Sequence, residues 1–302
     1  MLFDFLKTLL LFKFSFCTFI VMKFFFTYLM ILVLFSCVKD SSYFKIENLN
    51  NNQITILGHR GMGELYKYPG NSYEAIYPVI GIGADGTEFD VQITKDSVLV
   101  LFHDLEMSPN STCDLTMYLH NWFEIDGCTY NTIFPNIYII TVENLFCRIP
   151  NLHELTFSFD CKIPQNMPTE FLRTFARAIK RISEKYQMTD KILIEGNEYF
   201  IKVLQEEGLQ NKLFVSGTGD LNKSITLAKE MNTFGVAIDQ SYVTAEDVKK
   251  AHNEGLFVML WGAKTRPQSI KMIEKNPDIV QSDKPMYVLK IFNRFNYDYN
   301  IP

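Results

Sequence analysis

Short apolar runs rich in β-branched residues alternate with amphipathic segments from residue 54 onward. The short runs predict strands, and the segments between them predict helices. Residues 169–187 are the clearest helix, because their apolar residues recur every three or four positions and form one stripe. Such alternation is typical of a largely parallel α/β sheet. The predicted strands are residues 54–58, 86–92, 98–102, 156–161, 191–195, 212–216, 235–239, 256–261 and 278–282.

An eight-stranded (β/α) barrel of roughly 250 residues fits this alternation and the length that follows residue 54. One strand is in excess, and only five residues separate the second and third strands. That is too short for a parallel crossover, so these two strands should form an antiparallel hairpin. We therefore expect a distorted TIM (β/α)8 barrel over residues 54–302, with an early β-hairpin. Residues 105–150 exceed the usual connection of about 2 to 6 residues and are expected to form a long loop over the barrel mouth.

The expected hairpin brings polar residues together. A tight turn centred on Lys95 and Asp96 would pair residues whose numbers add up to 191. In that register one face of the hairpin is wholly apolar. The opposite face would carry Glu88 and Asp90, with His103 directly across from Glu88. The expected apolar pairs are Phe89 with Phe102, Val91 with Val100 and Ile93 with Val98.

The N-terminal residues have the features of an export signal. Residues 24–35 form a 12-residue apolar run, shorter than the roughly 20 residues that span a bilayer but suited to a signal-peptide core. The run ends in Leu-Phe-Ser-Cys, which resembles the lipobox of bacterial lipoproteins, with Cys37 as the lipidated residue. We expect a leader over residues 1–36, with Met22 as the true start because Met1–Val21 is a second apolar stretch. A signal anchor or a hairpin of two membrane helices is the alternative.

Residues 37–53 would then be a lipid anchor and a hydrophilic tether, and the protein would be exported and held at the membrane on its periplasmic or cell-surface face. Export permits disulfides. Beyond the leader and Cys37, the four remaining cysteines allow three full pairings. Cys113 and Cys128 flank one loop and form the first candidate pair, with free thiols as the alternative. The other two are Cys147 and Cys161.

Composition excludes two classes of protein. The 302 residues are 47% hydrophobic and 21% charged, which excludes a disordered chain. The net charge is −5, and no stretch gathers the basic residues that bind a nucleic-acid backbone. We therefore expect a small-molecule substrate and no nucleic acid, and the sequence indicates no obligate protein partner.

Carboxylates on the predicted strands indicate a metal site. Glu88 and Asp90 are two positions apart on one strand, so their side chains share a face at a spacing of about 7 Å. Asp160 lies at the end of another strand, with Lys162 on the same face. Oxygen ligands of this kind favour one divalent cation, Ca²⁺ or Mg²⁺. The alternative is that Glu88 and Asp90 only decorate an exposed strand face.

Two histidines lie beside these carboxylates at strand ends. His59 and Arg60 follow the first strand, and His103 ends the third. Two histidines can exchange protons with the attacking and leaving groups of a phosphodiester, and an arginine can hold a phosphate oxygen. Which histidine acts as acid and which as base stays open. The remaining histidines, His120, His153 and His252, are interpreted as structural.

Short motifs recur along the chain around these residues. They are HRG at 59–61, PGNS at 69–72, GADGTEFDVQITKD at 83–96, VLVLFHD at 98–104, DCK at 160–162, Trp261 and IVQSDKP at 279–285. Taken together, over about residues 54–290, these motifs and their order resemble those of the glycerophosphodiester phosphodiesterases.

The resemblance implies a TIM barrel that hydrolyses glycerophosphodiesters to glycerol 3-phosphate and an alcohol. It further implies His59 and His103 as the acid/base pair, Glu88, Asp90 and Asp160 as ligands of one divalent cation, Arg60 and Lys162 as phosphate ligands, and Trp261 beside the substrate.

Some positions depart from the family's pattern. Gly70 stands where the family usually has Glu, so a carboxylate near the site is missing. Asp160 also stands where the family usually has Glu, and this shorter side chain bears on the choice of metal. Two other functions remain as alternatives. One is a phospholipase D-like hydrolase of lysophospholipids or sphingolipids, and the other is a phosphodiester-binding lipoprotein without turnover.

Overall fold

The computed structural model describes residues 44–217 and 219–302. The expected leader, its start at Met22 and the expected lipidation site Cys37 lie outside the described residues. Within the described ranges, no helix is both long enough and apolar enough to cross a membrane.

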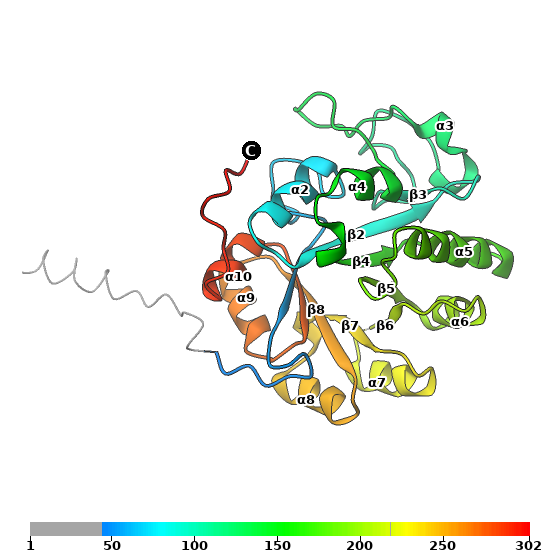
Figure 1. Ribbon diagram of the computed structural model, residues 1–302. Helices are drawn as coiled ribbons and strands as arrows, with labels where there is room; N and C mark the ends of the chain where they lie inside the picture. The colour runs from blue at the N-terminus through cyan, green and yellow to red at the C-terminus, as the bar shows by residue number, and fades with distance from the viewer. Residues whose placement is uncertain (1–43, 218) are drawn as a thin grey trace, which may run out of the picture. The chain divides into compact units, whose positions relative to one another are not determined.

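Eight parallel strands close into a barrel, and a further strand, β3, pairs antiparallel with β2 (Figure 1). The order around the barrel is β1-β2-β4-β5-β6-β7-β8-β9, and β9 pairs with β1 to close it. The predicted TIM barrel and early hairpin are therefore confirmed. The strands are β1 (Thr55–Gly58), β2 (Gly86–Ile93), β3 (Leu99–Leu101), β4 (Thr156–Cys161), β5 (Ile192–Gly196), β6 (Lys212–Ser216), β7 (Gly235–Asp239), β8 (Phe257–Ala263) and β9 (Ile279–Ser282).

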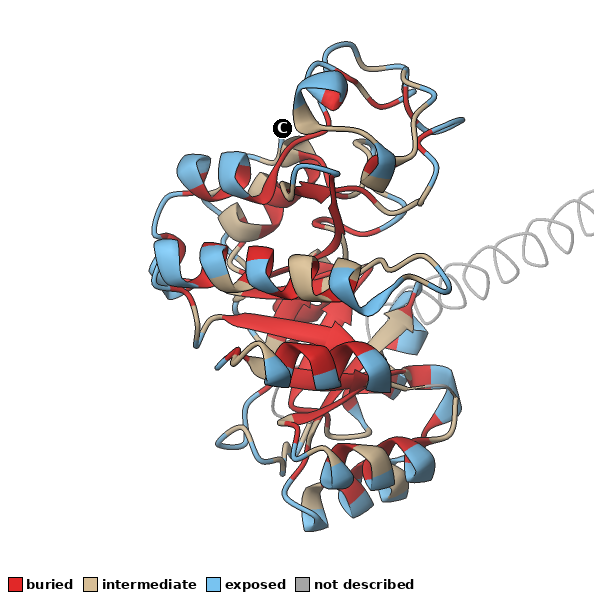
Figure 2. Cartoon of the chain, turned by 90° about the vertical axis from the view of Figure 1, so that its right-hand side faces the viewer, coloured by how far each residue is buried: buried red, intermediate tan, exposed pale blue. Residues whose placement is uncertain are grey.

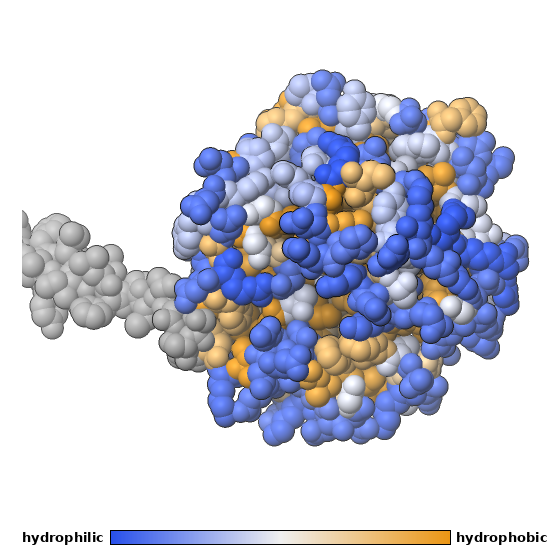
Figure 3. Space-filling view, in the orientation of Figure 1, coloured by the Kyte–Doolittle hydropathy of each residue, from blue (hydrophilic) through white to orange (hydrophobic). Residues whose placement is uncertain are grey.

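Helices surround the barrel and turn their apolar stripes toward the strands (Figure 2). The stripe predicted for residues 169–187 is the buried face of α5, where Leu172, Phe175 and Ile179 are at most 2% exposed. Hydrophilic residues cover most of the face shown in Figure 3. The helices are α2 (Tyr73–Gly81), α3 (Trp122–Ile125), α4 (Val142–Arg148), α5 (Thr169–Lys185), α6 (Glu198–Glu206), α7 (Leu221–Glu230), α8 (Ala245–Asn253), α9 (Arg266–Ile273) and α10 (Pro285–Ile291), and the 3₁₀ helices are η2 (Met117–Leu119), η3 (Leu152–Glu154) and η4 (Gln240–Tyr242).

The hairpin forms with a register one residue away from the predicted one. Val91 pairs with Leu101, and Ile93 pairs with Leu99. His103 is consequently not directly opposite Glu88, although it still lies near that residue. The predicted pairs that prove wrong are Phe89 with Phe102, Val91 with Val100 and Ile93 with Val98.

Two local features explain the shift in register. The turn holds three residues, because the amide of Thr94 donates to the carbonyl of Val98 at 3.0 Å and Ser97 has a positive φ of 66°. In addition, β3 is apolar at every position and buried on both faces. Because apolar and polar residues do not alternate in β3, its sequence carries no information about register, and either pairing would bury apolar side chains.

Apolar side chains fill the barrel and the layer under the helices. One cluster of buried residues inside the barrel includes Leu57, Phe214 and Met259. Larger clusters occupy the space between the strands and the helices. Polar and charged residues gather beyond the interior cluster, at the carboxyl ends of the strands, which is where TIM barrels build their sites.

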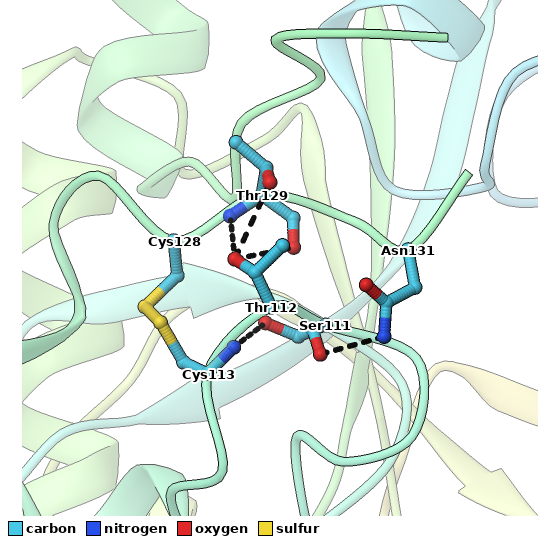
Figure 4. Close-up of a disulfide and its surroundings, with 6 residues drawn as sticks. All are labelled: Ser111, Thr112, Cys113, Cys128, Thr129 and Asn131. Atoms are coloured by element: carbon cyan, nitrogen blue, oxygen red, sulfur yellow. Dashed lines mark hydrogen bonds between the residues drawn. A yellow bond between two sulfur atoms is a disulfide. The ribbon is translucent and has the colours of Figure 1, made fainter. Parts of the chain in front are cut away.

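Residues 105–140, here called the disulfide lobe, form a small unit outside the ring of helices, with α3 at its edge (Figure 1). Its apolar residues, with Val100 of β3 and Phe102 just after that strand, form a separate cluster that includes Met117 and Ile125. Cys113 and Cys128 form a disulfide within it (Figure 4). The first candidate pairing is therefore confirmed, and Cys147 and Cys161 are free thiols.

The described part of the expected tether, residues 44–53, contacts the barrel. The side chain of Asn48 donates to the carbonyl of Pro277 at 2.8 Å, and the backbone amide of Leu49 donates to the Asp278 carboxylate at 2.8 Å. His252 binds the second oxygen of Asp278 at 2.9 Å, which agrees with its interpretation as a structural residue. These residues therefore belong to the folded domain.

Candidate active site

A cavity of about 370 Å³ opens among the carboxyl ends of the barrel strands. All eight residues that the sequence predicts for catalysis, metal binding or substrate binding lie there: seven line the cavity and the eighth, Asp90, is buried directly beside them. These eight residues come from segments that are more than 200 positions apart in the chain. The seven lining residues are His59, Arg60, Glu88, His103, Asp160, Lys162 and Trp261.

Three carboxylates meet at one side of this cavity. Glu88 and Asp90 lie on β2, and Asp160 is the direct neighbour of Asp90 on β4. One carboxylate oxygen from each lies within 4.8 Å of the others. Glu88 and Asp90 are at most 1% exposed. This is the arrangement that the i, i+2 spacing and the strand-end position of Asp160 predict.

The charges of this cluster are poorly balanced around Glu88. Burial raises the pKa of Glu88 to about 8, against the effect of His59, and the nearby charges of Asp90 and Asp160 act in the same direction as burial. Asp90 differs, because Lys162 and Arg60 outweigh its burial and lower its pKa. A divalent cation among the three oxygens would relieve the repulsion at Glu88. The donor set of three carboxylates therefore fits a hard cation.

His59 is held in one orientation by a carboxylate from the last strand. Its Nδ1 lies 2.8 Å from Oδ1 of Asp283, and its Nε2 lies 3.9 Å from Glu88. Burial lowers the pKa of His59, but the hydrogen bond to Asp283 and the charge of Glu88 outweigh it and raise the pKa to about 9. The sequence motifs predict no role for Asp283. Its position directly after a predicted strand, like that of Asp160, was the available signal.

Arg60 packs tightly against the carboxylate cluster. Its backbone has a positive φ of 52°, and its amide donates to Glu88 at 2.8 Å. The Nε atom of its side chain forms an ion pair with Asp90 at 2.9 Å. A Cβ atom at Gly70 would lie 2.8 Å from Cβ of Arg60. The departure from the family's pattern at Gly70 therefore gives the Arg60 side chain the room that it occupies.

His103 lies at the boundary between two cavities. It lines the cavity already described and a second one of about 370 Å³, and its side chain is 42% exposed. Its Nδ1 lies 2.7 Å from Oδ1 of Asp104, whose other oxygen accepts from Asn110 of the disulfide lobe at 2.5 Å. The lobe therefore helps to fix the orientation of this imidazole.

Lys162 and Trp261 occupy different walls of the first cavity. The ammonium group of Lys162 lies 2.9 Å from Asp90 and 2.5 Å from Asp160, so it neutralises two members of the cluster. Trp261 projects from β8 on the far wall, beside Asp239 of the paired strand β7. The side-chain amide of Asn71 donates from Nδ2 to the Asp90 carboxylate at 2.7 Å, and its Oδ1 accepts from the backbone amide of Asp90 at 3.0 Å. A phosphate group entering this cavity would meet Arg60, Lys162 and two histidines.

Comparisons with known proteins agree with this geometry. The model of the glycerophosphoryl diester phosphodiesterase family matches residues 59–286. A glycerophosphodiester phosphodiesterase of Caldanaerobacter subterraneus is 22% identical over 249 residues, covering 79% of this chain and 98% of the relative. A glycerophosphocholine phosphodiesterase of Candida albicans is 36% identical over 70 residues, but this match spans 21% of this chain and only 6% of the relative.

Solved structures agree on the fold. A phosphodiesterase of Oleispira antarctica, crystallised with the product sn-glycerol-3-phosphate, superposes with a TM-score of 0.67. It is 16% identical, and the superposition covers 78% of this chain and 96% of that one. At this level of identity, the likeness supports the shared barrel and carries no assignment of individual residues.

Proposed function

Because the chain belongs to the glycerophosphoryl diester phosphodiesterase family, we propose that it hydrolyses glycerophosphodiesters to glycerol 3-phosphate and an alcohol. The observation that carries this proposal is the meeting of three carboxylates, two histidines, an arginine and a lysine around one cavity. The glycerol 3-phosphate bound to the Oleispira antarctica phosphodiesterase supports the same product class. The membership itself rests on the match over residues 59–286.

Glu88, Asp90 and Asp160 would hold one divalent cation, Ca²⁺ or Mg²⁺. The support is the 4.8 Å cluster of their oxygens and the raised pKa of Glu88, which indicates a position that lacks positive charge. When bound, the cation would supply positive charge for the phosphate oxygens. Arg60 and Lys162 would bind further phosphate oxygens from the neighbouring wall.

The two histidines would carry out the proton transfers. In the proposed reaction, the P–O bond to the alcohol breaks, and the alcohol oxygen must receive a proton. His103 suits this transfer because it faces the second cavity as well as the first. The attacking oxygen would form the new bond to phosphorus and give its proton to His59, whose Nδ1 is fixed by Asp283 and whose Nε2 is directed toward the carboxylate cluster. A cation held beside Glu88 would offset the charge of that carboxylate, which helps to raise the pKa of His59 to about 9, and so would leave Nε2 able to take up this proton.

The second cavity provides space for the alcohol half of the diester. It shares Arg60, Glu64 and His103 with the first cavity, so a phosphate near these residues could extend into both. Its remaining walls come from residues 69–71 and from Phe102, Tyr130 and polar groups of the disulfide lobe. The lobe would therefore contribute to the choice of alcohol, as the length of the 105–150 segment predicts.

Release of glycerol 3-phosphate tests the proposal. Residues 38–302 would be stripped with a chelator and assayed on glycerophosphocholine and glycerophosphoethanolamine. We expect activity to be lost on chelation and restored by Ca²⁺ or Mg²⁺. Restoration by one ion only would also identify the cation. Failure with both ions, together with choline release from lysophosphatidylcholine, would instead assign the chain to the lysophospholipid hydrolases.

We also propose that the protein is exported and anchored to the membrane through Cys37. The disulfide between Cys113 and Cys128 supports an oxidising compartment, and the Leu-Phe-Ser-Cys sequence supports lipidation. In cells, Cys37→Ala is expected to move the protein from the membrane fraction to the soluble fraction, measured by immunoblotting of separated fractions. Cys147→Ala serves as the matched control because Cys147 is a free, exposed thiol of the folded domain. An unchanged membrane fraction for Cys37→Ala would contradict the lipid anchor.

A further inference from the structure

Another buried carboxylate of the first cavity, Glu195, has no role in the reaction as described above. It lies at the carboxyl end of β5 and is 5% exposed. Its Oε1 atom accepts hydrogen bonds from Ser158 of β4 at 2.7 Å and from Gln281 of β9 at 2.5 Å. Strands β5 and β9 lie on opposite sides of the barrel. The three residues therefore form a polar layer across the barrel, above its apolar interior.

Stability alone does not account for a carboxylate at this position. Burying a carboxylate costs free energy unless a cation or several donors compensate it. Among the residues that the structure describes, no cationic side chain lies within 4.0 Å of Glu195, and both of its hydrogen-bond donors are neutral. Apolar residues fill the rest of the barrel interior. An apolar residue here would continue that packing, so the carboxylate points to a use other than packing.

The second oxygen of Glu195 is free to bind a ligand. Both internal hydrogen bonds end on Oε1, and within the described ranges no donor to Oε2 is found. Glu195 lines the first cavity. Small residues, Ser216, Gly217 and Ala237, also line this cavity. A Cβ atom at Gly217 would lie 2.9 Å from the Ile238 side chain, so the close packing there leaves no room for a larger residue.

We infer that Glu195 is a substrate-positioning residue whose Oε2 accepts a hydrogen bond from a free hydroxyl group of the glycerol half of the diester. This inference rests on the proposed function, which places the phosphate near Arg60, Lys162 and the carboxylate cluster. The glycerol half then extends toward β6 and β7, where Glu195 is the buried acceptor at the floor of the cavity. The ligand class is a phosphodiester that carries a vicinal diol.

The test compares two competitive inhibitors that differ only in these hydroxyl groups, glycerol 3-phosphate and propyl phosphate, in assays with glycerophosphocholine. In Glu195→Gln, the amide oxygen can keep the hydrogen bonds from Ser158 and Gln281, while an amide nitrogen, which cannot accept, replaces Oε2. We expect the inhibition constant of glycerol 3-phosphate to rise roughly 10- to 100-fold, and that of propyl phosphate to change less than about threefold. Glu198→Gln, an exposed position on α6, is the matched control and should change neither value.

Other outcomes would overturn the inference. An equal loss of affinity for both inhibitors would indicate a structural role, and no loss for either would show that Oε2 contacts no hydroxyl group. A raised cation requirement in Glu195→Gln would make the residue a metal ligand instead. If this variant does not fold, Ser158→Ala, which removes one of the two hydrogen bonds that hold Glu195, should raise the inhibition constant of glycerol 3-phosphate alone, by roughly threefold or more, and an unchanged constant would count against the inference. Wild-type protein without turnover of any glycerophosphodiester would contradict the proposed function itself.

Discussion

Alanine at His59 or at His103 is expected to lower kcat for glycerophosphocholine by roughly 10²- to 10⁴-fold, the usual contribution of a positioned general acid or base. Both imidazoles line the first cavity, and His103 also lines the second. Neither is part of the apolar packing of the barrel, so the folded structure should persist. Steady-state kinetics with saturating cation, together with thermal unfolding of each variant, would measure the two effects separately.

His153→Ala is the matched control, because His153 is exposed on η3, outside both cavities. It should keep the wild-type kcat. His59→Asn adds a second check, since an amide can still donate to Asp283 and so removes the imidazole without leaving that carboxylate unpaired. Near-normal rates in both alanine variants would remove the histidines from the chemistry, whatever their position in the cavity.

Replacement of Glu88 by glutamine is expected to raise the cation concentration for half-maximal activity by roughly 10²-fold or more, because one charged ligand of three is lost. The amide oxygen of the new side chain can still accept from the backbone of Arg60, as Glu88 does at 2.8 Å. The local backbone should therefore keep its conformation. Titration of the chelated protein with Ca²⁺ and with Mg²⁺, read as activity and as thermal stabilisation, measures the change.

Glu64→Gln provides the comparison in the same cavity. Glu64 pairs with Lys264 at 2.6 Å and is not a member of the carboxylate cluster, so its substitution should leave the cation requirement unchanged. Equal shifts in the two variants would mean that the cavity attracts cations only through its overall charge.

The affinity for the cation should also depend on pH in the wild type. With the pKa of Glu88 raised to about 8 in the metal-free protein, a proton must leave this carboxyl before it can bind a cation. Affinity should therefore increase as the pH rises from 6 to 8 and level off above that value. Glu88→Gln lacks this proton and should lose that part of the dependence, which calorimetric titration at several pH values would measure.

Most of the fold could be predicted from local patterns. Each of the nine predicted strands is present, because each is a short apolar run between turn residues or amphipathic helices. Helix starts are also local features, because caps act within a single turn: Thr244 caps α8, and Pro267 and Pro285 lie in the first turns of α9 and α10. The hairpin register could not be predicted, because β3 is buried on both faces and its partner in packing, the disulfide lobe, lies later in the chain.

The candidate site was predictable where its residues follow strands and carry reactive groups. The cluster of Glu88, Asp90 and Asp160 is an example, since parallel strands bring their carboxyl ends together. Asp283 and Glu195 were missed as members of the site for a different reason. Their significance depends on partners that are distant in the sequence. His59 and Asp283 follow the paired strands β1 and β9, and Gln281 and Glu195 lie on strands across the barrel from each other. A single sequence does not state which strands pair or face each other.

The separate core of the disulfide lobe bears on how proteins of this kind can diverge. The buried residues of its apolar cluster and its cross-link lie within residues 100–139, with Tyr68 the one described residue from before the hairpin that packs against them, so insertions or exchanges there disturb few contacts of the barrel. The metal ligands and His59 lie on the barrel strands and stay in place under such changes. As long as Asn110 keeps its contact with Asp104 beside His103, preference for the alcohol can evolve in the lobe while the chemistry of the phosphate is inherited from the barrel.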